Sequence, residues 1–209
     1  SGAGKTTLLR AIAGLQPSSG KVFCGDEDVS DFSPGARASA LVADRDGLFP
    51  HLTVQENVAL AGGNAEDLQV TLTDLGLSSL ARQYPGSLST GQRQMVALAR
   101  ALLRRPRWLL FDEPLAHVDP YSRLRLRGEI LRIHRRIGAA SLYVTHDLPE
   151  AYAIADRIIL LREGKIIQDD YPQDLVSHPA DLQTALYLGA TTQVSTTALI
   201  NTDRFGQVS

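Results

Sequence analysis

The sequence predicts an α/β fold with a mostly parallel sheet and helices packed on its faces. Short apolar runs at 108–111 and 141–144 alternate with helical patterns, as expected for strands that are buried on both faces. A helical pattern from about 54 to 80 interrupts this alternation, so we expect a helical insertion in the α/β core. The chain has 209 residues, 44% of them apolar, which is enough to bury a sizeable core.

The composition excludes several classes of protein. With 21% charged residues and a formal net charge of −2, the chain is neither disordered nor collagen-like, nor a basic binder of nucleic acid along its whole length. The apolar runs are far shorter than the roughly 20 residues that a membrane-spanning helix needs, so we expect a soluble chain. Its single cysteine, Cys24, cannot form an internal disulfide, and no signal peptide precedes the first motif. These features favour a reducing, cytosolic setting.

The chain opens on a glycine-rich segment, Ser1-Gly2-Ala3-Gly4-Lys5-Thr6-Thr7. It matches the end of the phosphate-binding (Walker A) pattern G-x-x-x-x-G-K-[ST], whose first glycine would fall two positions before Ser1. We therefore expect a chain that is truncated within this loop. Lys5 would reach the β- and γ-phosphates, and the Thr6 hydroxyl would ligate Mg²⁺. The alternative is a glycine-rich turn that caps a helix and binds nothing.

The first half of the chain continues from this loop into a short helix, which Gly14 ends. Residues 17–47 are rich in turn formers, with strand-like runs at 21–24 and 40–43. The helical pattern that follows has its apolar spacing at Leu68, Leu72 and Leu75.

The second half resumes the alternation of helices and strands. A helix from about Ser89 to Arg104 is stopped by Pro106, and a basic helix is expected over 124–137. Residues 156–168 read as a β-hairpin centred on Glu163-Gly164, followed by short helical pieces and a polar tail from Thr191.

Two acidic residues, Asp112 and Glu113, directly follow the apolar run at 108–111. Acids at the carboxyl end of a buried strand lie at the mouth of an open α/β sheet, where ligands bind. Asp112 would hold the Mg²⁺ shell and Glu113 would polarise the attacking water. The alternative is that both acids cap a helix starting near Pro114.

An ordered set of motifs resembles the nucleotide-binding subunit of ATP-binding cassette (ABC) transporters over nearly the whole chain, up to about Gly189. The motifs are Leu88-Ser-Thr-Gly-Gln92, Trp108 to Pro114, Leu115 to Asp119 and Val144-Thr-His-Asp147. Leu48-Phe-Pro-His-Leu-Thr-Val54, with Glu56-Asn57, further looks like the importer branch. The resemblance implies a P-loop NTPase core of the ABC type at 1–190, with a helical subdomain at about 48–105. Residues 191–209 would be a polar tail or the start of a truncated further domain.

The resemblance also implies roles for individual residues. Ser89, Gly91 and Gln92 would bind the γ-phosphate of an ATP held by the opposite subunit, so two copies would sandwich two ATP molecules head to tail. His146 would contact the γ-phosphate and orient water near Glu113. The implied catalytic residues are Glu113 and His146, and the metal ligands are Thr6, Asp44 and Asp112. The implied nucleotide-binding residues are Ser1, Gly2, Ala3, Gly4, Lys5, Thr6, Thr7, Ser89, Gly91, Gln92 and Asp119. Asp119 would lie at the dimer seam, with an ordinary N-cap as the alternative.

Two positions depart from the family pattern. Asp44 stands where the family has the glutamine that touches Mg²⁺ and water, and Thr90 replaces the first glycine of the signature loop. Aspartate is shorter and anionic, so it adds repulsion toward the γ-phosphate, and we hypothesise slower hydrolysis. The β-carbon of Thr90 removes some backbone freedom, but activity is expected to survive.

The leading hypothesis is therefore an ATPase subunit on the inner face of the cell membrane, which powers uptake through partner permeases with an external binding protein. The alternatives are a non-transport ABC ATPase of DNA repair or translation, and a weakened regulatory nucleotide-binding protein. The arginines between 123 and 136 are expected to be a solvated helix face rather than a nucleic-acid site, since aromatic residues are not interleaved with them. The adenine-stacking residue would lie upstream of Ser1, and the transported substrate would be chosen by the permease.

Overall fold

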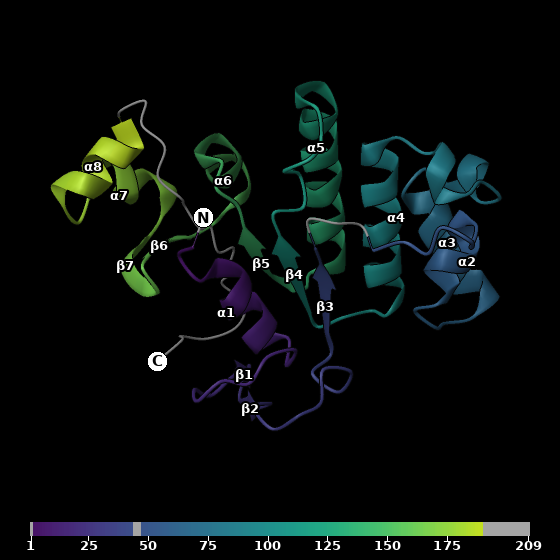
Figure 1. Cartoon of the computed structure of the whole chain (residues 1–209), viewed down its shortest axis with the longest axis horizontal. Coiled ribbons are helices and arrows are strands. Elements are labelled where there is room, and N and C mark those ends of the chain that lie inside the picture. The colour runs from purple at the N-terminus through teal and green to yellow at the C-terminus, as the bar shows by residue number, and fades with distance from the viewer. Residues whose placement is uncertain (1, 44–46, 190–209) are drawn as a thin grey trace. The chain divides into compact units, whose positions relative to one another are not determined.

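The computed structural model describes residues 2–43 and 47–189 (Figure 1). Two of the expected site residues, Ser1 and Asp44, and the tail from Thr191 lie outside this described part. Contacts divide the chain into two compact units. Unit 1 contains the residues up to Ser39, Leu110–Glu113 and the residues from Ala140 onward, and unit 2 contains Ala40–Leu109 and Pro114–Ala139.

The central sheet has three parallel strands in the order β3 (Ser39–Val42), β4 (Trp108–Asp112) and β5 (Ala140–Val144) (Figure 1). The apolar run of β4 is buried, with Leu110 wholly inaccessible to solvent, as expected of a strand covered on both faces. The structure also describes two antiparallel strand pairs. In the first, β1 (Phe23–Cys24) pairs with β2 (Glu27–Asp28), and in the second, β6 (Ile158–Arg162) pairs with β7 (Lys165–Asp170). The α/β class with a mostly parallel sheet is confirmed.

Unit 1 is built around the helix that follows the glycine-rich loop. This helix, α1 (Lys5–Ile12), packs against β5. The predicted hairpin forms as β6 and β7, and its turn residues Glu163 (φ 51°) and Gly164 (φ 75°) are both left-handed. The remaining helices of the unit are α6 (Leu148–Ile154), α7 (Pro172–Ser177) and α8 (Leu182–Gly189).

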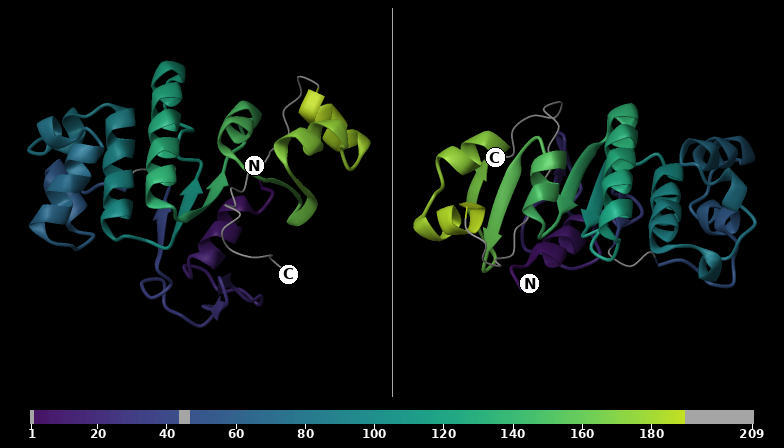
Figure 2. Two further views of the ribbon diagram at one scale, coloured as in Figure 1. Left: turned by 180° about the vertical axis from the view of Figure 1, so that it is seen from behind. Right: turned by 90° about the horizontal axis from the view of Figure 1, so that it is seen from above.

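Unit 2 is mostly helical. Its elements after β3 are α2 (Val54–Ala59), α3 (Ala65–Asp74), η1 (Ser78–Leu80), η2 (Pro85–Ser87), α4 (Thr90–Leu103) and α5 (Pro120–Ile137). The helical pattern over 54–80 is thus two α-helices and a 3₁₀ turn. Helices α4 and α5 run side by side (Figure 2).

Capping residues decide where the helices of unit 2 begin. Thr53 and Ser89 each form a capping box, with Glu56 and Gln92 respectively, at the starts of α2 and α4. The expected start of α5 at 124 was wrong, because the helix begins four residues earlier at Pro120. Asp119 caps it and the proline occupies the first helical position, where its missing N–H costs nothing.

Asn57 fastens the loop that precedes α2. Its side chain is fully buried and its Oδ1 accepts the Phe49 N–H at 2.8 Å. Its Nδ2 lies within 3.1 Å of the carbonyl oxygens of Phe49, Leu52 and Thr53 and donates to them. The conformation of the 49–53 loop therefore depends on one buried amide. Among the described residues, no helix combines the length and hydrophobicity needed to cross a membrane.

Candidate functional site

The glycine-rich loop of unit 1 has the backbone of an anion-binding turn. Gly2 (φ 93°) and Gly4 (φ 90°) are left-handed, a conformation that glycine adopts without a β-carbon penalty. Gly4 is the N-cap of α1, and within the described residues no side chain caps this helix. The first N–H groups of a helix have no partner inside it and carry the positive end of the helix dipole. The start of α1 can therefore bind a phosphate group.

Thr6, in the first turn of α1, meets the end of strand β4. Its Oγ1 donates to Asp112 Oδ1 at 3.0 Å, although the two residues are 106 positions apart in the sequence. Asp112 is buried, with 7% of its surface exposed, while its carboxylate faces this hydroxyl. A hydroxyl and a carboxylate oxygen are the hard donors that Mg²⁺ prefers.

Glu113 stands next along the chain in a strained backbone conformation. Its φ of 48° is left-handed, which costs a residue with a side chain about 1–3 kcal/mol. Its N–H donates to the Val144 carbonyl at 2.9 Å, which ties it to the end of β5. The bond holds this turn against the neighbouring strand, and 28% of the Glu113 side chain is exposed.

The Glu113 carboxylate lies close to both the Lys5 ammonium group and the His146 imidazole. Its Oε2 is 2.7 Å from His146 Nδ1, and its Oε1 is 4.0 Å from the ammonium group of the buried Lys5. Thus Lys5, Thr6, Asp112, Glu113 and His146, expected from separate motifs, lie together in unit 1.

The β6–β7 turn contacts the glycine-rich loop from another side. The Gly164 N–H donates to the Ala3 carbonyl at 3.2 Å. A β-carbon built on Gly4 would lie 3.9 Å from the Gly164 Cα, so two glycines bring the backbones close. The sequence indicated this turn but not its contact with the loop, because the residues are more than 150 positions apart.

Three further expected site residues, Ser89, Gly91 and Gln92, belong to unit 2 at the start of α4, and Thr7 lies in the first turn of α1 in unit 1. The Gln92 N–H donates to Ser89 Oγ at 3.2 Å, and the Ser89 N–H donates to Gln92 Oε1 at 2.8 Å. Since Ser89 Oγ accepts in this pair, its hydroxyl hydrogen can still donate to a ligand. Gly91 is buried, and a β-carbon there would approach Leu126 Cδ1 to 3.2 Å. A larger residue at this position would therefore require the Leu126 side chain on α5 to shift.

Asp119 is the N-cap of α5, the structural alternative raised by the sequence. Its Oδ1 accepts the Ser122 N–H at 3.0 Å, and this backbone hydrogen bond lowers the pKa of the carboxyl. A carboxylate can accept more hydrogen bonds than this one, so the proposed position at a dimer seam is compatible with the cap.

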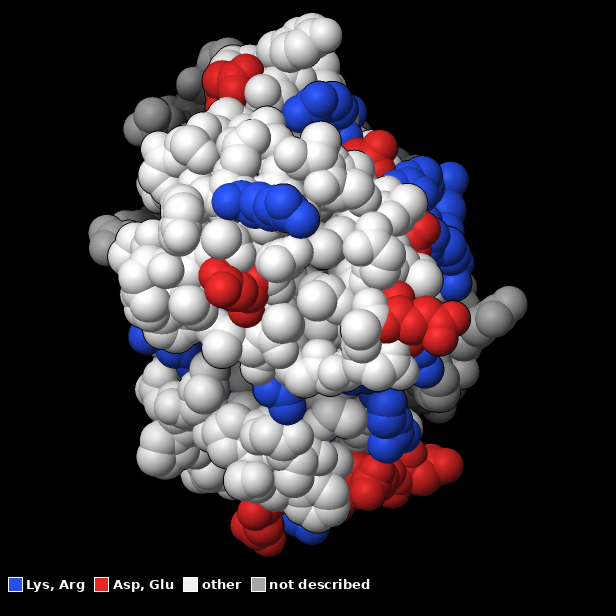
Figure 3. All heavy atoms as spheres, turned by 90° about the vertical axis from the view of Figure 1, so that its right-hand side faces the viewer, with Lys and Arg blue, Asp and Glu red and all other residues white. Residues whose placement is uncertain are grey.

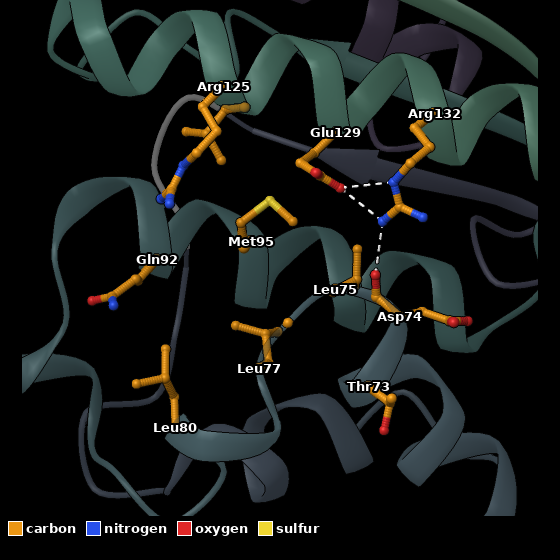
Figure 4. Close-up of a pocket in the computed structure, with 12 residues that line it drawn as sticks. Thr73, Asp74, Leu75, Leu77, Leu80, Gln92, Met95, Arg125, Glu129 and Arg132 are labelled. Atoms are coloured by element: carbon orange, nitrogen blue, oxygen red, sulfur yellow. Dashed lines mark hydrogen bonds and ion pairs between the residues drawn. The ribbon is translucent and has the colours of Figure 1, made fainter.

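A groove of about 410 Å³ lies in unit 2, between α3 and η1 on one side and α4 and α5 on the other (Figure 4). Leucine side chains and Met95 line it, and Arg125 and Arg132 stand at its edge (Figure 4). Arg132 is engaged by Glu129 at 2.7 Å and by the Asp74 carbonyl at 2.8 Å. Gln92 also lines the groove, so packing here bears on the start of α4.

A family model described as ABC transporter matches residues 1–116. The chain is 41% identical to the sn-glycerol-3-phosphate import ATP-binding protein UgpC of Roseobacter denitrificans, over 91% of this chain and 56% of the relative.

Two further relatives carry similar names. The Fe(3+) ions import ATP-binding protein FbpC 2 of Rhizobium meliloti is 43% identical over 94% of this chain and 52% of its own length. The putative 2-aminoethylphosphonate import ATP-binding protein PhnT of Salmonella typhimurium is 42% identical over 100% of this chain and 59% of its own length. The chain thus spans between half and three-fifths of the length of these relatives.

Proposed function

The chain belongs to the ABC transporter family, and from this premise we propose that it is the ATP-binding and ATP-hydrolysing subunit of an importer. The observation that carries the proposal is the gathering of Lys5, Thr6, Asp112, Glu113 and His146 at the start of α1 and the ends of β4 and β5. Each supplies a group that phosphoryl transfer to water needs. We also propose an ATPase domain over residues 1–190 with a helical subdomain over about 48–105.

The phosphates of ATP would lie on the first turn of α1. The backbone amides there and the Lys5 ammonium would balance the charge of the β- and γ-phosphates. In the described structure Lys5 is near Glu113, so nucleotide binding would exchange a carboxylate for a phosphate as its partner. A buried ammonium group needs such an anion, because burial disfavours an uncompensated charge.

Thr6 and Asp112 are suited to hold Mg²⁺. Two adjacent oxygens of an octahedral Mg²⁺ with bonds of about 2.1 Å lie about 3 Å apart. Thr6 Oγ1 and Asp112 Oδ1 are 3.0 Å apart, so the two side chains would hold one ion together. When bound, it would supply positive charge to the phosphates. Asp44 remains a proposed further ligand on sequence grounds alone.

Glu113 and His146 would act on the attacking water. The Glu113 carboxylate accepts a hydrogen bond from the water, whose oxygen forms a bond to the γ-phosphorus while the bond to the β-phosphate oxygen breaks. The products are ADP and inorganic phosphate, and the proton of the water passes to solvent through Glu113. His146, 2.7 Å from the carboxylate, orients it and contacts the γ-phosphate.

A second copy of the chain would complete each site. The Ser89 hydroxyl and the Gly91 amide lie at the start of α4, where the helix dipole favours an anion, and would bind the γ-phosphate held by the partner subunit. Asp119 would lie at the seam between the subunits. The arrangement is twofold and head to tail, so the dimer contains two equivalent sites.

Unit 2 offers a surface for membrane permeases. Phe49, Leu60 and Val70 each expose about half of their surface, at 46%, 55% and 54%. Figure 3 shows that charged side chains on the side of the molecule that includes α2 and α3 are scattered, with large uncharged areas between them. Docking of permeases here would place the subunit on the inner face of the membrane, with an external binding protein delivering substrate.

ATP turnover of the complex between the chain and its permeases tests the proposal. Glu113→Gln should retain ATP binding and lose more than about 100-fold in turnover, because the water loses its acceptor. Glu163→Gln is the matched control, since Glu163 is also a left-handed glutamate of unit 1 (φ 51°), but it lies on an exposed turn. A rate that does not depend on Glu113 would contradict the catalytic assignment, and failure to co-purify with permeases would contradict the transport assignment.

A further inference from the structure

Arg37 is a buried arginine that the proposed chemistry does not use. Only 6% of its surface is exposed. Its guanidinium donates to four backbone carbonyls: to Ala11 at 2.9 Å and Ile12 at 2.8 Å through Nη1, to Ser30 at 2.6 Å through Nη2, and to Phe32 at 3.1 Å through Nε. One side chain thus joins the end of α1 to the segment that follows β2.

The end of α1 is built to receive this guanidinium. The Leu15 N–H donates to the Arg10 carbonyl and the Gly14 N–H to the Ala11 carbonyl, which is the pattern of a Schellman cap with Gly14 left-handed at φ 75°. A β-carbon on Gly14 would come within 2.7 Å of Arg37 Nε, so glycine is required there for space as well as for conformation. The Ile12 carbonyl accepts from Arg37, and a cation at this position is favoured by the negative end of the helix dipole.

The two ends of α1 are mechanically coupled. With eight residues the helix is about 12 Å long, too short to bend appreciably. Its first turn carries Lys5 and Thr6, and a change of tilt at the last turn moves both relative to Asp112 and Glu113. The Thr6 to Asp112 distance of 3.0 Å tolerates little displacement.

We infer that Arg37 is a positioning residue for nucleotide binding, which fixes the C-terminal end of α1 so that Lys5 and Thr6 meet the phosphates and Mg²⁺. The inference rests on the proposed function, because the position of α1 affects nucleotide binding only if the chain binds a nucleotide. Arginine suits the task, since its planar fork spans four acceptors in two segments, whereas a lysine ammonium is a single point.

The experiment compares Arg37→Met, Arg37→Lys and Arg10→Met in the 209-residue chain. Arg10 is an exposed arginine of the same helix, so its variant controls for loss of an arginine from this region. Two quantities are measured: the Kd for Mg-ATP of the folded fraction, by equilibrium binding, and the hydrogen exchange of the amides of α1 and of β5. Arg37→Met should weaken Mg-ATP binding about ten-fold and Arg37→Lys about three-fold, with Arg10→Met unchanged. Exchange should quicken in α1 more than in β5.

The alternative outcomes are distinct. If Arg37 serves stability alone, its variants lose folded protein while the remaining folded fraction binds Mg-ATP with a Kd within two-fold of the unmodified chain, and the inference is wrong. Should Arg37→Met fail to fold, the same criterion applied to Arg37→Lys decides. The proposed function has a separate test: it is overturned by an ATP turnover of the permease complex that does not depend on Glu113, whatever the Arg37 variants do. Mg-ATP binding by the unmodified chain that the Arg37 variants leave unchanged overturns the inference alone.

Discussion

The buried amide of Asn57 gives a prediction whose size can be worked from the structure. The Asn57→Ala variant removes the acceptor of the Phe49 N–H and the donor to the carbonyls of Phe49, Leu52 and Thr53. Asn57 is fully buried, so water cannot replace the side chain without rearrangement of the loop. The variant should therefore be destabilised well beyond an ordinary surface substitution.

The magnitude follows from the bonding capacity of the side chain. Here Oδ1 accepts one N–H and the two hydrogens of Nδ2 can each donate well to one carbonyl, which makes three good hydrogen bonds, each with a net contribution of about 1 kcal/mol. The expected loss in the free energy of unfolding is therefore about 3 kcal/mol. Asn57→Asp should cost at least as much, because it places a negative charge against three carbonyl oxygens.

Urea unfolding followed by the fluorescence of Trp108, which lies in unit 2 and is the only tryptophan of the chain, measures this loss. Asn64→Ala is the matched control, since exposed Asn64 caps α3 through a single bond to the Asp67 N–H at 2.8 Å and should cost about 1 kcal/mol. If Asn57→Ala cost no more than Asn64→Ala, the reasoning that one amide fixes the 49–53 loop would be refuted.

Three further predictions concern the chemistry and the pH dependence. Asp44→Gln should raise ATP turnover of the assembled complex, because it removes the negative charge that the family resemblance would place near the γ-phosphate, and an unchanged or lower rate would count against this. His146→Ala should lower kcat about 100-fold with a smaller effect on ATP binding, and equal effects on both would argue against a role in orienting Glu113. Hydrogen bonds from the Ser30 hydroxyl and N–H, together with Lys21, lower the pKa of Asp28 from 3.8 to about 2, so ionised Asp28 stabilises the fold above about pH 3.8 and this is lost as the pH falls toward 2. In Ser30→Ala, which removes the hydroxyl and keeps the N–H, NMR titration should find the pKa of Asp28 moved up toward 3.8, and an unmoved value would exclude the Ser30 hydroxyl as the main cause.

The sequence by itself determined those structural features that depend on residues close together along the chain. The buried strand at 108–111 and the Glu163-Gly164 turn were predictable, because hydrophobic pattern and turn preference act over a few residues. The helix caps at Ser89 and Asp119 likewise depend on residues within three positions of the cap. The start of α5 was missed because Pro120 was not recognised as a first helical residue, and the break between α2 and α3 because apolar spacing continues across it. The motif order also gave the family, which the match over residues 1–116 confirms.

Only the tertiary structure decided which of these residues meet. The contact of Thr6 with Asp112, the position of Glu113 between Lys5 and His146, and the bond from Gly164 to Ala3 each join residues that are at least 33 positions apart. No local preference encodes such distances, since they follow from how α1, β4, β5 and the β6–β7 turn pack. Arg37 shows this most clearly: in the sequence it is one arginine among many in a turn-rich stretch. Burial against the end of α1, 25 residues away, makes it the guanidinium on which the proposed phosphate site depends.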